Sequence, residues 1–121
     1  MQRAIVGLAL LAIVACAHWP CDYHPDTRSR SPDGQYDVVR YWKSCGAMMG
    51  SRYGISLVRA GSELTGETDI RVFYYARGGA MRPATATWKP DGSLEIMHDA
   101  KAEVITQLIV VSGIPVSYRA Y

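Results

Sequence analysis

The chain has 121 residues, enough for one domain of ordinary size and too few for a two-domain enzyme or a doubly wound dinucleotide-binding fold. Its charges nearly cancel, because 13 Lys and Arg residues stand against 11 Asp and Glu residues. A dedicated nucleic-acid-binding protein carries a clustered excess of Lys and Arg, so this balance argues against nucleic acid as the partner.

Residues 1–15 have the layout of a secretory signal peptide. Arg3 and the N-terminal amine form a short positive region, and Ala4–Ala15 is an unbroken run of uncharged, mostly apolar residues. A membrane-spanning helix needs about 20 such residues, whereas His18 and Trp19 soon end this run. We therefore expect residues 1–15 to be removed during export.

The end of the run, Ile13-Val14-Ala15-Cys16, resembles a bacterial lipobox, in which an aliphatic residue and two small or aliphatic residues precede Cys. In bacterial lipoproteins, a diacylglycerol alkylates this thiol and the signal peptide is cut just before it. Two or three acyl chains, at about 0.8 kcal/mol per buried methylene, anchor a protein stably. Ala17 is not acidic, which resembles the sorting signal of Gram-negative outer-membrane lipoproteins. Cys16 is thus the expected lipidation site, on the periplasmic face of the outer membrane.

An ordinary signal peptide is the alternative. Ala15-Cys16-Ala17 also fits the small-x-small cleavage site of a signal peptidase. Cleavage there would leave a soluble periplasmic or secreted protein without Cys16.

The two other cysteines, Cys21 and Cys45, are natural disulfide partners once Cys16 carries lipid, because the periplasm is oxidising. Two free thiols, or Cys45 buried as a small apolar residue, are the alternative. The spacing of Cys21 from His18 and His24 is not typical of a zinc site. We expect neither a metal ion nor a cofactor.

The remaining chain divides into a tether and a domain. Residues 16–33 are polar, contain prolines and lack apolar periodicity, which predicts a lipidated Cys followed by a flexible tether. Residues 34–121 are predicted to form one all-β domain. Alternating apolar and polar residues, or β-branched and aromatic residues, predict strands at Tyr36–Trp42, Tyr53–Val58, Ile70–Arg77, Ala84–Trp88, Leu94–His98 and Ile114–Tyr118.

Two similar segments, Ser31-Pro32-Asp33-Gly34 and Lys89-Pro90-Asp91-Gly92, predict hairpin turns, because Pro sets one backbone angle and Gly supplies a positive φ.

The secondary structure of residues 99–111 is ambiguous. Asp99 could cap a helix, but the β-branched residues that follow favour a strand, with a helical first turn possible. Together these segments predict about six or seven strands, arranged as a small antiparallel β-sandwich or curled sheet.

Four landmarks occur in order between Ser31 and Tyr118. They are Ser31-Pro32-Asp33-Gly34-Gln35-Tyr36, Cys45-Gly46-Ala47, Trp88 followed by Asp91-Gly92-x-Leu94-x-Ile96, and Val111-x-Gly113-Ile114-x-Val116-x-Tyr118. Together they resemble an uncharacterised family of small exported bacterial proteins and lipoproteins with an SPDG opening, a CGATT-like turn and a W…DGxLxI hairpin. Met48 and Met49 stand where that family has two Thr. The resemblance implies export and the fold class, and it transfers no catalytic residue.

Candidate catalytic residues are few. The sequence has no nucleophile-elbow, metalloprotease or P-loop motif. His98 and Asp99 would point to opposite faces of a strand. Glu95 and Glu103 are two carboxylates of the kind that strands expose to solvent, and nothing nominates a base for Cys45. We therefore expect a protein that is not an enzyme, with a small hydrolase that uses His98 or Cys45 as a minor alternative.

The segment from Arg71 to Arg82 has the composition of an interaction surface, because Tyr and Arg are enriched in interface hot spots and two Gly residues suit a presented loop. The candidate partner-binding residues are Arg71, Tyr74, Tyr75, Arg77 and Arg82. An ordinary edge strand with one aromatic face in the core is the competing interpretation.

The sequence as a whole predicts an envelope lipoprotein that acts as a binding domain. Its partners would be the lipid bilayer, through Cys16, and a protein of the envelope. One form is an inhibitor or immunity protein against a toxin that acts in the periplasm, by analogy alone. The alternative is a structural or accessory outer-membrane lipoprotein that contacts the cell wall or an envelope assembly.

Overall fold

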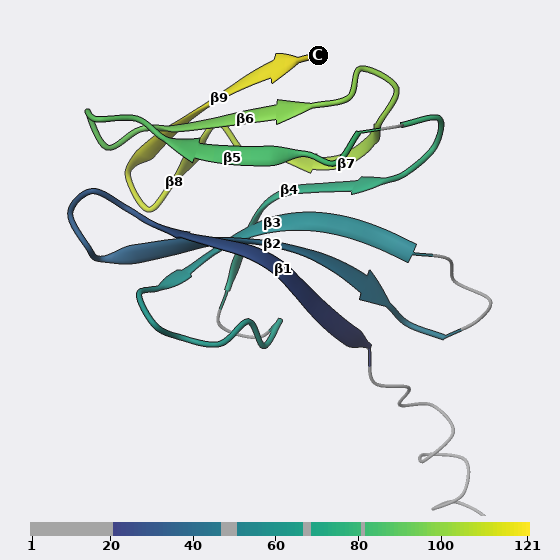
Figure 1. Cartoon of the computed structure of the whole chain (residues 1–121), viewed down its shortest axis with the longest axis horizontal. Coiled ribbons are helices and arrows are strands. Elements are labelled where there is room, and N and C mark those ends of the chain that lie inside the picture. The colour runs from purple at the N-terminus through teal and green to yellow at the C-terminus, as the bar shows by residue number, and fades with distance from the viewer. Residues whose placement is uncertain (1–20, 47–50, 67–68, 81) are drawn as a thin grey trace, which may run out of the picture.

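Two β-sheets stack face to face in the computed structural model, which describes residues 21–46, 51–66, 69–80 and 82–121 (Figure 1). The strands are β1 (Asp22–Arg30), β2 (Tyr36–Ser44), β3 (Ser51–Arg59), β4 (Ile70–Ala76), β5 (Thr85–Trp88), β6 (Leu94–His98), β7 (Glu103–Gln107), β8 (Val110–Val111) and β9 (Ile114–Ala120). One sheet has the order β1-β2-β3-β4-β7 and the other β5-β6-β9-β8. The predicted all-β class is confirmed, with nine strands instead of six or seven.

Strand β1 corrects the prediction that residues 16–33 are a flexible tether, because a nine-residue strand occupies Asp22–Arg30. It pairs with β2 along its length, with a register shift between Pro25 and Thr27. An edge strand is held by backbone hydrogen bonds to one neighbour and can keep most of its side chains in solvent, as β1 does. The apolar pattern that we used to find strands is therefore absent from it.

The second sheet is not purely antiparallel. Strands β6 and β9 run parallel, while the other neighbouring pairs are antiparallel. The parallel pair arises because the chain leaves β6, adds β7 to the first sheet, and returns through β8 to the second. The ambiguous segment 99–111 forms a turn and then strands β7 and β8, so the strand interpretation is confirmed.

Both predicted hairpin turns are present, and each is closed by its Asp side chain. In the β1–β2 turn, the Asp33 carboxylate accepts hydrogen bonds from the Ser31 hydroxyl at 2.6 Å and the Gln35 N–H at 3.1 Å. In the β5–β6 turn, Asp91 accepts from the Ser93 hydroxyl and N–H at 2.6 and 2.9 Å. Gly34 and Gly92 have φ of 76° and 88°, which side chains disfavour.

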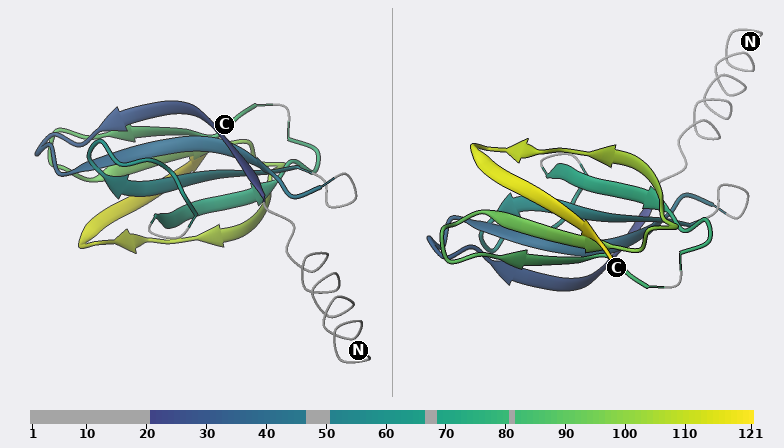
Figure 2. Two further views of the ribbon diagram at one scale, coloured as in Figure 1. Left: turned by 90° about the horizontal axis from the view of Figure 1, so that it is seen from below. Right: turned by 90° about the horizontal axis from the view of Figure 1, so that it is seen from above.

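The core lies between the sheets and is aliphatic with a few aromatic rings. Its buried members include Val38, Ile55, Leu57, Phe73, Leu94, Ile96, Val111 and Val116. The sandwich is closed on one side where the Trp88 indole N–H donates to the Ser29 carbonyl at 3.0 Å. On the other side the chain passes directly from β7 to β8, which run along the sandwich almost as one line (Figure 2).

The outer face of the five-stranded sheet is also largely covered. Residues 60–66, which follow β3 in its connection to β4, run beneath this face (Figure 1). Val39, Tyr41 and Val58 are buried there, although they do not face the second sheet. The connection is held where Asp37 accepts a hydrogen bond from the Gly61 N–H at 2.9 Å.

Among the described residues there is no helix long and apolar enough to cross a membrane. The predicted signal peptide and Cys16 lie outside the described residues.

Candidate binding surfaces

Three of the five predicted partner-binding residues line one groove. This aromatic–arginine groove has a volume of about 170 Å³, and its lining residues are Tyr53, Tyr75, Arg77, Ala80, Arg82 and Pro83. The Tyr53 and Tyr75 rings stack with their centroids 5.4 Å apart, since the two residues are paired across β3 and β4. The Tyr75 hydroxyl accepts a hydrogen bond from the Ala84 N–H at 3.1 Å, which joins the two sheets. Burial raises the pKa of Tyr75, so the phenol is neutral.

The Gly78-Gly79 turn shapes the rim of the groove. Gly78 has φ of 53°, and a Cβ added to it would lie 3.2 Å from the Lys101 carbonyl oxygen. The turn is closed by the Ala80 N–H, which donates to the Arg77 carbonyl at 2.8 Å, and by Arg77 Nε, which donates back to the Ala80 carbonyl at 3.2 Å. The predicted role of the two Gly residues in forming a loop agrees with this geometry.

The Arg77 and Arg82 side chains are exposed on either side of the groove. The Arg82 guanidinium carbon lies 5.2 Å from the centre of the Tyr121 ring, and the Tyr121 hydroxyl donates to the Pro83 carbonyl at 2.7 Å. Ion pairs in the described part of the chain are Arg28–Asp37, Arg30–Asp37, Arg40–Asp26 and Lys89–Glu95. Arg77 and Arg82 take part in none of these ion pairs, although the Asp99 carboxylate accepts a hydrogen bond from the Arg82 N–H at 3.2 Å.

A second hollow adjoins the groove and shares Tyr53, Tyr75 and Pro83 with it. Its wall includes Trp42, which is 40% exposed and stacks on His24 with ring centroids 3.8 Å apart and planes 12° apart. We did not predict this pair, because His24 lies in the segment that we took for a tether. Once β1 is known to be a strand, the register places His24 directly opposite Trp42.

Arg71 and Tyr74 do not belong to the groove, which corrects the predicted set. They lie on the opposite, outer face of the five-stranded sheet, where the Arg71 guanidinium carbon is 3.9 Å from the centre of the Tyr74 ring. Tyr74 is only 7% exposed. Neighbouring Tyr41 is fully buried, and this burial raises its pKa despite the hydrogen bond from Ser56. Tyr41 and Tyr74 are thus packed into the outer face, and Arg71, which lies over the Tyr74 ring, is partly buried.

An apolar surface on the β7–β8 side was missed by the sequence reasoning. Seven large apolar side chains are exposed in the described residues, and four of them, Val104, Ile105, Ile109 and Val110, fall within seven consecutive positions. Ile109 is 76% exposed and Val110 57%. We call these four residues the apolar corner.

The strand pattern explains the exposure of the apolar corner. Strand β7 is the last strand of one sheet and β8 the last of the other, so each has one unpaired side. A register shift against β4 leaves Ile105 without a partner, between the pairs Tyr75–Val104 and Tyr74–Thr106. Val104 and Ile105 are adjacent apolar residues, and Leu108 to Val111 are four in a row, so alternate side chains of these runs must point away from the core, a signal that the sequence already contained.

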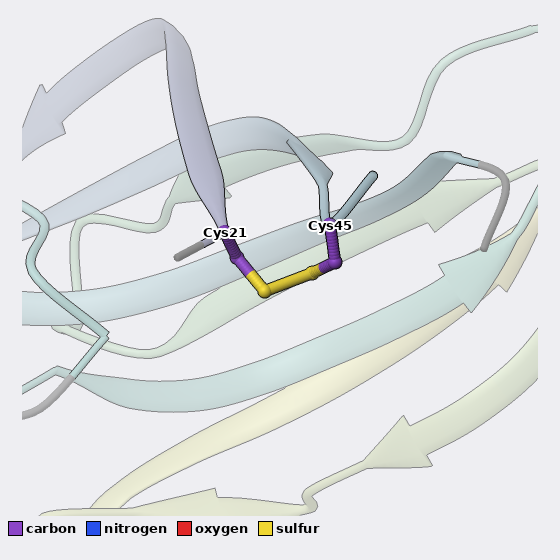
Figure 3. Close-up of a disulfide and its surroundings, with 2 residues drawn as sticks. All are labelled: Cys21 and Cys45. Carbon is purple, nitrogen blue, oxygen red and sulfur yellow. A yellow bond between two sulfur atoms is a disulfide. The ribbon is translucent and has the colours of Figure 1, made fainter. Parts of the chain in front are cut away.

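The residues considered for hydrolysis do not converge. Cys45 is bonded to Cys21, with an S–S distance of 2.13 Å and the two Cα atoms 4.2 Å apart (Figure 3). Glu95 pairs with Lys89 in one sheet, while Glu103 is exposed on β7 of the other. His98 Nδ1 lies 3.0 Å from the Asp99 carbonyl oxygen, and the Asp99 carboxylate accepts from the Lys101 N–H at 2.9 Å.

The predicted Cys21–Cys45 bridge is thus present, one residue beyond the Asp22–Ser44 pair of β1 and β2. In the described residues, no group of three or more His, Cys, Asp or Glu side chains could hold a metal ion.

Comparisons with protein-family models, with curated proteins and with solved structures find no match. A function has to be argued from the residues themselves.

Proposed function

We propose that this protein is a lipid-anchored domain of the bacterial envelope that works by binding a partner protein at its apolar corner, without catalysing a reaction. The exposure of Ile105 on β7, Ile109 in the link to β8 and Val110 on β8 is the observation that carries the proposal. Soluble proteins rarely expose contiguous apolar side chains unless these contact a partner.

The backbone at the apolar corner adds to this argument. The unpaired N–H and C=O groups of an edge strand can receive a further strand from another chain, and alternate apolar side chains then give specificity. Native proteins protect such edges with charged side chains, Pro, β-bulges or very short strands. Residues 104–110 contain no charged residue and no Pro, so the register shift at Ile105 and the shortness of β8 are the protection that this edge has. An extended apolar segment of a partner protein suits this surface.

The anchor is supported by sequence and chemistry together. Cys16 ends a lipobox, and a Cys21–Cys45 disulfide is stable in an oxidising compartment such as the periplasm. An inhibitor or immunity protein against a periplasm-acting toxin is one biological form that such a domain takes, by analogy with other anchored β domains.

Photo-cross-linking in the native bacterium tests the partner site. A photoreactive amino acid at position 109 should form an adduct with one envelope protein, and a Val110→Asp substitution in the same chain should abolish it. The matched control places the same amino acid at position 117, because Ser117 is exposed on β9 outside the apolar corner. Loss of a central interface residue usually weakens binding by about 2 kcal/mol or more.

Three outcomes would count against the proposal. Equal adducts from positions 109 and 117 would show that the apolar corner has no special affinity. An adduct with peptidoglycan or lipopolysaccharide would favour the accessory lipoprotein instead. The lack of any adduct in cells that carry the anchored protein would refute the claim that a partner protein binds there.

A further inference from the structure

The two ends of the sandwich carry different chemistry. One end holds the Cys21–Cys45 bridge (Figure 3). The strand registers place Tyr53 and Tyr75, and with them the aromatic–arginine groove, at this same end. We call this the anchored end. The opposite end, the turn end, holds both Pro-Asp-Gly turns, which line one shared hollow with Trp88.

The length of chain between Cys16 and Cys21 limits where the domain can lie. Five residues span at most about 18 Å when fully extended, whereas β1 alone, with nine residues, extends about 30 Å. The bridge holds the start of β1 against the end of β2, so β1 cannot separate from the sheet and lengthen the connection. An acylated Cys16 therefore keeps the anchored end within reach of the bilayer surface.

The side chains of the anchored end suit that surface. Trp42 and Tyr121 are each 40% exposed, and Trp and Tyr favour the interface between headgroups and water. Arg77 and Arg82 are exposed beside the groove and take part in none of the ion pairs of the described residues, and cationic side chains are attracted to anionic lipids. The Asp99 carboxylate lies beside Arg82, whose N–H donates to it at 3.2 Å. With Lys43, Arg52 and Lys101, the two arginines still outnumber the carboxylates of Asp22, Asp99 and Glu103 at this end, and Asp26 is paired with Arg40.

The turn end is less suited to an anionic surface. Its carboxylates Asp33 and Asp91 lie in the two exposed turns, and hydrogen bonds from Ser31 and Ser93 lower their pKa values, so both are charged at neutral pH. Among the cations of this end, Lys89 is paired with Glu95, and Arg28 and Arg30 share the Asp37 carboxylate, while Arg59 is exposed. Phosphate groups of a membrane would be repelled by these turns and attracted by the opposite end.

We propose that the anchored end faces the bilayer and that the aromatic–arginine groove takes the phosphate of a phospholipid headgroup between Arg77 and Arg82. Trp42 and Tyr121 then lie at the depth of the headgroups. This inference rests on the lipid anchor proposed above. It leaves the apolar corner, which runs along the side of the sandwich, open to a partner protein.

Tryptophan quenching in vesicles tests this orientation with an internal control. The lipidated protein is inserted into vesicles of phosphatidylethanolamine and phosphatidylglycerol whose acyl chains are brominated near the headgroup. In a Trp19→Phe background, Trp88→Phe leaves Trp42 as the reporter of the anchored end. Trp42→Phe leaves Trp88 as the matched reporter of the turn end. We expect Trp42 to lose most of its emission and Trp88 to keep it.

Removing the two arginine charges tests whether the groove binds the headgroup phosphate. Replacing both Arg77 and Arg82 with Gln should reduce the quenching of Trp42 in anionic vesicles, whereas Arg59→Gln, an exposed arginine of the turn end, should not. Equal quenching of the two tryptophans, or an unquenched Trp42 in protein that floats with the vesicles, would overturn the orientation alone. Failure of the wild-type protein to float would overturn the anchor and the orientation with it.

Discussion

Asp37 is a buried carboxylate whose charge ties three parts of the fold together. Its side chain is 1% exposed and accepts hydrogen bonds from Arg28 at 2.8 Å, Arg30 at 3.1 Å and the Gly61 N–H at 2.9 Å. Arg28 also donates to the Ser62 carbonyl at 2.7 Å. The carboxylate therefore connects β1, β2 and the connection that covers the outer face of the sheet.

The contribution of the Asp37 charge to the free energy of unfolding follows from the pKa of this carboxyl group. Burial alone raises this pKa, but the hydrogen bonds from Gly61, Arg30 and Arg28 outweigh it and lower the pKa from 3.8 to about 2. One pKa unit corresponds to about 1.4 kcal/mol, so the ionised form contributes about 2 kcal/mol of stability at neutral pH. The folded-state pKa is depressed, so this contribution is complete above about pH 4 and disappears as the pH falls through about 2.

The substitution Asp37→Asn should therefore destabilise the protein by about 2 kcal/mol at neutral pH and have little effect near pH 2. Urea unfolding followed by circular dichroism at both pH values measures this difference. Asp22→Asn is the matched control, because Asp22 is exposed on β1, the edge strand that also carries Arg28 and Arg30, and such a change usually alters stability by less than about 0.5 kcal/mol. A destabilisation that is the same at both pH values, or none at neutral pH, would refute the reasoning.

Two further predictions concern stability. Reduction of the Cys21–Cys45 bridge, or the double substitution Cys21→Ala with Cys45→Ala, should lower the free energy of unfolding by up to about 3.5 kcal/mol, the chain-entropy value for its 25-residue loop. An unchanged unfolding midpoint, in protein whose mass shows that both cysteines are reduced, would contradict this. Burial raises the pKa of Tyr118 to about 12, so its stabilisation is complete below about pH 10 and is lost as the pH rises toward 12. An ultraviolet titration should lose one late-titrating phenol in Tyr118→Phe, and an unchanged titration would speak against a buried phenol.

Turns and strands that are specified by residues close together in the chain could be predicted from the sequence. The turn at Lys89–Gly92 is specified by Pro, Asp and Gly within four residues, and it joins β5 to β6 as expected. Strand β1 could not be found in this way, because its stability comes from pairing with β2 and not from apolar side chains of its own. Missing β1 also placed the start of the domain too late and accounts for one of the two additional strands; the other arises because segment 99–111 forms both β7 and β8.

The candidate site was predictable only where its residues are close in sequence. Tyr75, Arg77 and Arg82 flank one Gly-Gly turn, and the turn brings them into one groove. Tyr53 joins them through the β3–β4 register, which composition does not give. Tyr74 is separated from this group because successive side chains of a strand point to opposite faces, so it lies with Arg71 on the other side of the sheet.

The central claim, a lipid anchor at Cys16, is tested most directly by the intact mass and membrane fraction of the protein from its native bacterium, beside a Cys16→Ala variant. The account predicts a chain that begins at Cys16, carries added acyl chains and sediments with the outer membrane, and a variant that lacks this modification. A soluble, unmodified chain that begins after Cys16 would contradict the anchor.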